Sequence, residues 1–64
     1  MQQHIITKIT LKALQDYSFL GLKKGDRFTL TLNKNGYLEN NGRTWSQEGI
    51  KKEIEKGFWG VEGN

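Results

Sequence analysis

Two segments in which apolar and polar residues alternate constrain the fold of this chain more than any other feature. Residues 5–13 and residues 27–32 both have the period of two that is typical of a half-buried β-strand, with Ile6 as an exception. We expect one face of each strand to contribute to the core and the other to face solvent. The apolar residues expected on the buried faces are Ile5, Ile9, Leu11, Ala13, Phe28, Leu30 and Leu32.

Turn signals predict two shorter strands after these. Gly25 is expected to supply the positive φ that a tight turn into the second strand requires. The Asn-Gly pairs at 35–36 and 41–42 are among the strongest short signals for a β-hairpin. Only residues 37–39 lie between these turns, so the third strand is short, and a fourth short strand is expected at 43–45.

A helix is expected between Ser46 and Gly57. Ser46 is a favourable N-cap residue, and Trp45 and Ile50 occupy the two positions of a hydrophobic staple around the helix start. Gly57 suits the left-handed position at which many helices end. A short last strand is predicted after the helix, over residues 58–62.

The expected order of elements is that of an SH3-like barrel, in which a helical turn separates the fourth and fifth strands. Residues 13–17, Ala-Leu-Gln-Asp-Tyr, resemble the ALYDY motif of SH3 domains, and residues 22–26, Leu-Lys-Lys-Gly-Asp, resemble the segment at their diverging turn. The resemblance covers about the first half of the chain. It implies a single SH3-like domain over residues 1–64, mainly β with one α-helix, built as a five-stranded small barrel with the helix between strands 4 and 5.

The sequence matches the peptide groove of SH3 domains only at Tyr17. Residues 18–21 alone separate the two motifs, where SH3 domains have a long acidic loop, and Gln15 replaces the first Tyr of the motif. Because gripping a polyproline helix takes a ladder of aromatic side chains, we do not expect binding to Pro-rich peptides. The second half of the chain, with Arg-Thr-Trp-Ser before the expected helix, resembles the ending of small accessory proteins of phages and prophages.

Composition narrows the classes of function. The chain has 64 residues and no Cys, which excludes disulfides, thiolate metal ligands and a Cys nucleophile. At this size most large apolar side chains are needed for the core. The mean hydropathy of −0.73 predicts no transmembrane segment, and the start of the chain has no signal-peptide pattern. We therefore expect a cytoplasmic protein without a membrane partner, acting in the host cell if a phage encodes it.

No catalytic residue, metal ligand or cofactor site is predicted. His4 is the only histidine, and no second His, Cys or carboxylate cluster accompanies it, so we interpret it as an exposed residue without a catalytic role. Ser46 is expected to cap the helix rather than act as a nucleophile, and Ser18 has no neighbouring base. We therefore expect that the protein is not an enzyme and takes no cofactor.

Two binding functions remain, and we favour a protein-interaction module. In that interpretation the chain is a phage-type accessory factor that binds a host protein stoichiometrically and modulates or inhibits it. Tyr17 and Phe19, in the shortened loop, are the leading contacts, although both could instead close the end of the barrel. The aromatic residues proposed for protein binding are Tyr17, Phe19, Tyr37 and Trp59, each of which a small core could also recruit.

The alternative is a nucleic-acid-binding module that uses the outward face of the first two strands. Its basic residues are Lys8, Lys12 and Arg27, with Lys23 and Lys24 at the rim. A solvated sheet face with lysines that deter edge pairing would have the same composition. The net charge of +3 is modest for a protein that tracks a phosphate backbone, so this function ranks second. An SH3-like building block of a homo-oligomer is a third hypothesis.

Overall fold

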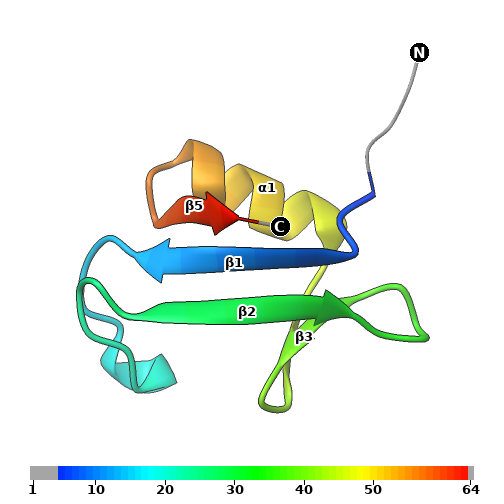
Figure 1. The fold of residues 1–64 in the computed structure, drawn as a ribbon, viewed down its shortest axis with the longest axis horizontal. Helices are drawn as coiled ribbons and strands as arrows, with labels where there is room; N and C mark the ends of the chain where they lie inside the picture. Colours follow the sequence, from blue (N-terminus) through cyan, green and yellow to red (C-terminus); the bar gives the residue numbers. More distant parts are fainter. Residues whose placement is uncertain (1–4, 64) are drawn as a thin grey trace.

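A computed structural model describes residues 5–63, in which the chain forms one five-stranded antiparallel sheet and one α-helix (Figure 1). A short 3₁₀ helix, η1 (Ser18–Leu20), lies between the first two strands, and α1 (Gln47–Glu55) lies between the last two. His4 lies outside the described residues. The strands are β1 (Lys8–Ala13), β2 (Arg27–Leu32), β3 (Leu38–Asn40), β4 (Arg43–Trp45) and β5 (Trp59–Gly63).

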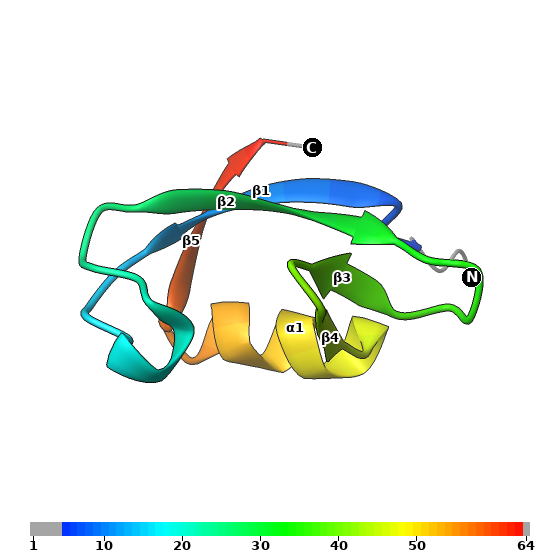
Figure 2. The ribbon, with the colours of Figure 1, turned by 90° about the horizontal axis from the view of Figure 1, so that it is seen from below.

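The strand order in the sheet is β4-β3-β2-β1-β5, so the last strand returns to pair with the first. All neighbouring strands are antiparallel, and Leu11 of β1 lies opposite Phe28 of β2 on one side and opposite Val61 of β5 on the other. The order leaves β4 and β5 as the two edges of the sheet. Figure 2 shows α1 across one side of the sheet, below β1 and β2. The prediction of a mainly β fold with one helix between the fourth and fifth strands is confirmed.

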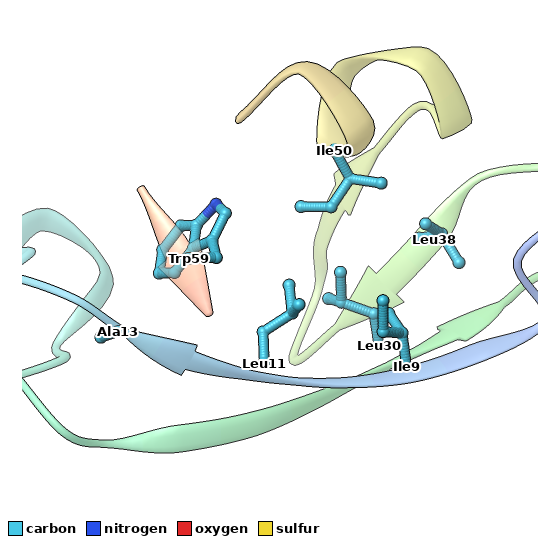
Figure 3. Packing of buried hydrophobic residues seen from close by; sticks show 7 residues of the cluster. All are labelled: Ile9, Leu11, Ala13, Leu30, Leu38, Ile50 and Trp59. Carbon is cyan, nitrogen blue, oxygen red and sulfur yellow. The ribbon is translucent and has the colours of Figure 1, made fainter. Parts of the chain in front are cut away.

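The core lies between the sheet and α1 (Figure 3). Ile50 projects from the helix toward the buried side chains of β1, β2 and β3. The alternation predicted for the two long strands is confirmed, because their polar residues face away from this cluster. The buried residues are Ile9, Leu11, Ala13, Leu30, Leu38, Ile50 and Trp59.

The prediction for Ile5 and Ile6 is wrong. Ile5 is 67% exposed, whereas Ile6 packs against the core. The alternation does not extend to these residues because β1 begins only at Lys8. Gln47, at the start of α1, holds the main chain at Ile6 through two hydrogen bonds: its Oε1 accepts from the Ile6 N–H at 2.9 Å, and its Nε2 donates to the Ile6 carbonyl at 2.8 Å. These bonds place Ile6 against the helix side of the core.

Both ends of α1 have the caps that the sequence predicts. The Ser46 hydroxyl accepts a hydrogen bond from the Gly49 N–H at 2.9 Å. At the other end Gly57 has a φ of 85°, and its N–H and that of Phe58 donate to the carbonyls of Ile54 and Glu53. This pair of bonds is a Schellman motif, which turns the chain sharply out of the helix. The turn fixes the position of Phe58 at the corner between α1 and β5.

Candidate functional site

An apolar groove opens between η1, β4 and the end of α1. Its volume is about 280 Å³. Segments far apart in the sequence meet here, and we refer to the site as the aromatic groove. The residues that line the aromatic groove are Tyr17, Phe19, Leu20, Arg43, Thr44, Trp45, Glu53, Phe58 and Trp59.

Tyr17 fixes the loop side of the aromatic groove to the rest of the fold. Its main chain forms two hydrogen bonds with Leu22, which close the loop around η1. Its hydroxyl donates to the Phe58 carbonyl and accepts from Gln15 Nε2, both at 2.9 Å. Its ring lies 4.5 Å from that of Trp59, measured between centroids. Tyr17 therefore ties η1 to the corner between α1 and β5, two parts of the chain that meet only in the folded state.

Trp59 forms the floor of the aromatic groove and belongs to the core. It is only 4% exposed, and its ring packs edge to face against Phe28 with the centroids 5.1 Å apart. The indole N–H donates to Glu53 Oε1 at 2.8 Å, which satisfies the one polar atom of the side chain. Trp59 is therefore a rigid support rather than a free stacking surface.

Phe19 and Phe58 provide the exposed apolar surface of the groove. Phe19 is 69% exposed, and its ring meets Tyr17 edge-on at a centroid distance of 6.1 Å. Phe58, at the corner between α1 and β5, is 37% exposed. Large exposed apolar side chains that gather at one hollow are typical of interaction sites.

Arg43 joins β4 to η1 and separates the aromatic groove from a smaller cavity. Its Nη2 donates to the Phe19 carbonyl at 2.8 Å. The smaller cavity has a volume of about 50 Å³ and shares Leu20, Arg43 and Trp45 with the groove. Its remaining lining residues are Leu22, Phe28, Asn40 and Asn41. Arg43 thus lines both hollows.

The structure brings three of the four predicted aromatic residues together, namely Tyr17, Phe19 and Trp59. Tyr37 does not join them. It is 48% exposed in the hairpin between β2 and β3, where its N–H donates to the Asn33 side chain. Figure 1 shows this hairpin at the opposite end of β2 from η1. The groove residues Arg43, Glu53 and Phe58 were not predicted, because no local pattern indicates that the end of α1 returns to the loop after β1.

The outward face of β1 and β2 carries the predicted basic residues, but an acidic residue lies among them. Lys12 is paired in register with Arg27, whose Nε donates to Glu62 Oε1 of β5 at 2.9 Å. The hydrogen bond from Arg27 lowers the pKa of Glu62, and the positive charges of Arg27 and Lys12 lower it further. Between the charged residues the hydroxyls of Thr10 and Thr29 are 3.0 Å apart and share a hydrogen bond.

Lys23 and Lys24 lie in a turn that contains its own carboxylates. The Lys23 N–H donates to Asp26 Oδ2 at 2.9 Å, and the Lys24 N–H donates to Asp16 Oδ1 at 2.8 Å. Gly25 has a φ of 95°, which confirms the positive value predicted for this turn. The two lysines are therefore placed beside two acidic residues, so the turn as a whole is close to neutral.

No protein-family model, curated protein or solved structure matches this chain. Within residues 5–63 no group of three or more His, Cys, Asp or Glu residues is arranged to hold a metal ion. None of the helices in that range is long and apolar enough to cross a membrane.

Proposed function

We propose that this chain is a non-catalytic protein-interaction module that binds a segment of a partner protein in the aromatic groove. The exposure of Phe19 at the rim of a groove with an aromatic floor carries this proposal. A Phe ring that stays in water does not contribute the stabilisation that its burial would give. In a domain of this size most large apolar side chains are needed for the core, so an exposed Phe is unusual. Contact with a partner would recover that stabilisation at Phe19 and Phe58.

The proposal includes an SH3-like barrel as the finer description of the fold. The strand order β4-β3-β2-β1-β5, with a helix between β4 and β5, supports it. The two motif-like segments, 13–17 and 22–26, flank η1 as the corresponding segments flank the specificity loop in SH3 domains. In this protein that loop is reduced to η1, so β4 and the end of α1 line more of the groove.

A protein partner fits the groove better than a nucleic acid fits the basic face. On the basic face Arg27 is already paired with Glu62, which leaves fewer cations to contact phosphates. The groove exposes two aromatic rings, Phe19 and Phe58, and aromatic and arginine side chains are enriched at protein interfaces. In this proposal the module is a phage-type accessory factor that acts in the host cytoplasm and modulates its partner by occupying a surface in fixed stoichiometry.

A displayed library of random short peptides can test the proposal before any natural partner is identified. A selected peptide, titrated into ¹⁵N-labelled protein, should shift the amide resonances of Phe19, Arg43 and Phe58. The amides of Lys8 and Thr31, on the outward face of the sheet, should stay in place. Peptides that shift the outward face instead, or the failure to select any peptide, would contradict the groove as the binding site.

Phe19→Ala should weaken binding of the selected peptide by at least about tenfold, because truncation of an exposed aromatic anchor removes much of the contact. Tyr37→Ala is the matched control, since Tyr37 is also an exposed aromatic residue and lies outside the groove. Its affinity should change by less than about twofold. Equal losses for the two variants would mean that binding does not use the groove.

The nucleic-acid alternative has a separate test by fluorescence anisotropy with a single-stranded oligonucleotide. At physiological salt we expect no dissociation constant below about one micromolar, the tight end of non-specific binding. A nanomolar dissociation constant that rises steeply with salt, and that is lost when Lys8, Lys12 and Arg27 are replaced by Glu, would make nucleic-acid binding the better proposal.

A further inference from the structure

The charge pattern of the aromatic groove indicates what chemistry the partner segment presents. Arg43 is an exposed cation at the boundary between the groove and the smaller cavity. A guanidinium has five N–H donors. One of them is used by the Phe19 carbonyl, and within residues 5–63 Arg43 pairs with no carboxylate. Donors therefore remain for a group that enters from outside.

Among residues 5–63, Glu53 of α1 is the only carboxylate that lines the groove, and it is already engaged. Glu53 Oε1 accepts the hydrogen bond from the Trp59 indole. Glu53 does not line the smaller cavity, where Arg43 lies with the side chains of Asn40 and Asn41 and with apolar residues. The site thus has one cation, Arg43, which lies beside Phe19 through its hydrogen bond to the Phe19 carbonyl, and two exposed aromatic rings, Phe19 and Phe58.

We infer that the partner segment carries an Asp or Glu side chain that pairs with Arg43, next to a bulky apolar side chain that packs between Phe19 and Phe58. This inference rests on the proposed function of the groove. A carboxylate can accept two parallel hydrogen bonds from a guanidinium, which fixes its orientation as well as adding to affinity. A basic side chain at the same position would meet the like charge of Arg43. The net charge of +3 on the protein also favours the approach of an acidic segment.

Selection of random displayed peptides on the wild type and on Arg43→Glu tests this inference. Peptides selected on the wild type should be enriched in an acidic residue next to an aromatic or aliphatic one. Selection on Arg43→Glu should favour Lys or Arg at that place instead. Lys34→Glu is the control for the change in net charge, because Lys34 is exposed in the hairpin between β2 and β3, and it should leave the acidic preference unchanged.

Arg43 also bonds to the Phe19 carbonyl, so the second measurement changes the peptide rather than the protein. Replacing the acidic residue of a selected peptide by its amide should weaken binding to the wild type by about tenfold, as expected for the loss of a paired charge. The same replacement should have little effect on binding to Arg43→Gln, so that the two changes are not additive. Arg43→Lys should retain part of the acidic preference.

The outcomes separate this inference from the proposed function. Selected peptides that bind the groove without acidic enrichment, or whose amide versions bind equally well, would overturn the inference and leave the groove as a protein-binding site. Peptides that bind away from Phe19 and Phe58, or the absence of any selected peptide, would overturn both.

Discussion

The outward face of β1 and β2 and the aromatic groove both carry cations, but they differ in the side chains that surround those cations. On the outward face Arg27 is paired with Glu62, and the hydroxyls of Thr10 and Thr29 share a hydrogen bond. In the groove Phe19 lies exposed beside Arg43, a cation that has no acidic partner within residues 5–63. Lys8 and Lys12 also form no ion pair within residues 5–63, so unpaired cations do not distinguish the two surfaces. The difference is that the cation of the groove lies beside exposed aromatic rings, whereas the outward-facing residues of β1 and β2 are Lys, Arg and Thr.

The largest change in unfolding free energy that we predict comes from Trp59, the core residue at the floor of the groove. Trp59→Ala should lower the free energy of unfolding by about 4 kcal/mol, because it removes a buried ring that packs on Tyr17 and Phe28. Lys8→Ala, on the outward face, should change it by less than about 0.5 kcal/mol. Denaturant unfolding measures both. A loss at Trp59 as small as that at Lys8 would mean that the floor of the groove is not part of the core.

A smaller effect should come from the hydroxyl that fixes the loop side of the groove. Tyr17→Phe removes the hydrogen bond to the Phe58 carbonyl and should cost about 1 kcal/mol of unfolding free energy. Tyr37→Phe is the matched control, since the Tyr37 hydroxyl makes no hydrogen bond within residues 5–63, and it should be close to neutral. Equal values for the two variants would contradict the role assigned to Tyr17.

Phe19→Ala should affect peptide binding much more than the free energy of unfolding. Because the Phe19 ring is mostly in water, its loss should change the free energy of unfolding by less than about 0.5 kcal/mol. The same variant is expected to lose peptide binding, as described above. Thermal unfolding with and without a selected peptide measures both properties in one experiment. A large loss of stability would instead indicate that Phe19 closes the fold.

The smallest effect concerns the ion pair on the outward face. Since the pKa of Glu62 is lower in the folded state, the ionised carboxylate favours folding above its unfolded pKa, and this contribution is lost as the pH falls through the folded value. Between about pH 6 and about pH 3 the wild type should therefore lose slightly more stability than Glu62→Gln. Glu55→Gln, an exposed carboxylate of α1, is the control. Parallel pH profiles for the wild type and Glu62→Gln would mean that the pair contributes nothing.

Elements governed by neighbours in sequence could be predicted. The caps Ser46 and Gly57 act within one helical turn, and the Asn-Gly turns act within four residues, so their residue types indicate the structure directly. The interior faces of β1 and β2 followed from their alternation. Ile6 was assigned to the wrong face because its position depends on hydrogen bonds to Gln47, which lies on the first turn of α1.

The candidate site could be predicted only in part, for the same reason. Tyr17 and Phe19 were predicted because one short loop contains both. Phe58 meets that loop only after α1 has crossed the sheet, and Arg43 meets it only once β4 has joined the sheet through β3. Glu62 reduces the charge of the basic face through a contact with a strand 35 positions away in the sequence. Residue types at neighbouring positions do not indicate contacts between residues so far apart in the sequence.

The pairing of β5 with β1 sets a time order on the folding of this protein as it is synthesised. β1 leaves the ribosome before the other strands of the sheet, but the strand that covers one of its edges, β5, is the last element of the described chain. Trp59, which completes the core, arrives with that strand. Since the intervening chain must close into a loop before these contacts form, the sheet cannot reach its final form until β5 has emerged. Until β5 is released, one edge of β1 has no partner strand and the core lacks the Trp59 ring that packs on Phe28.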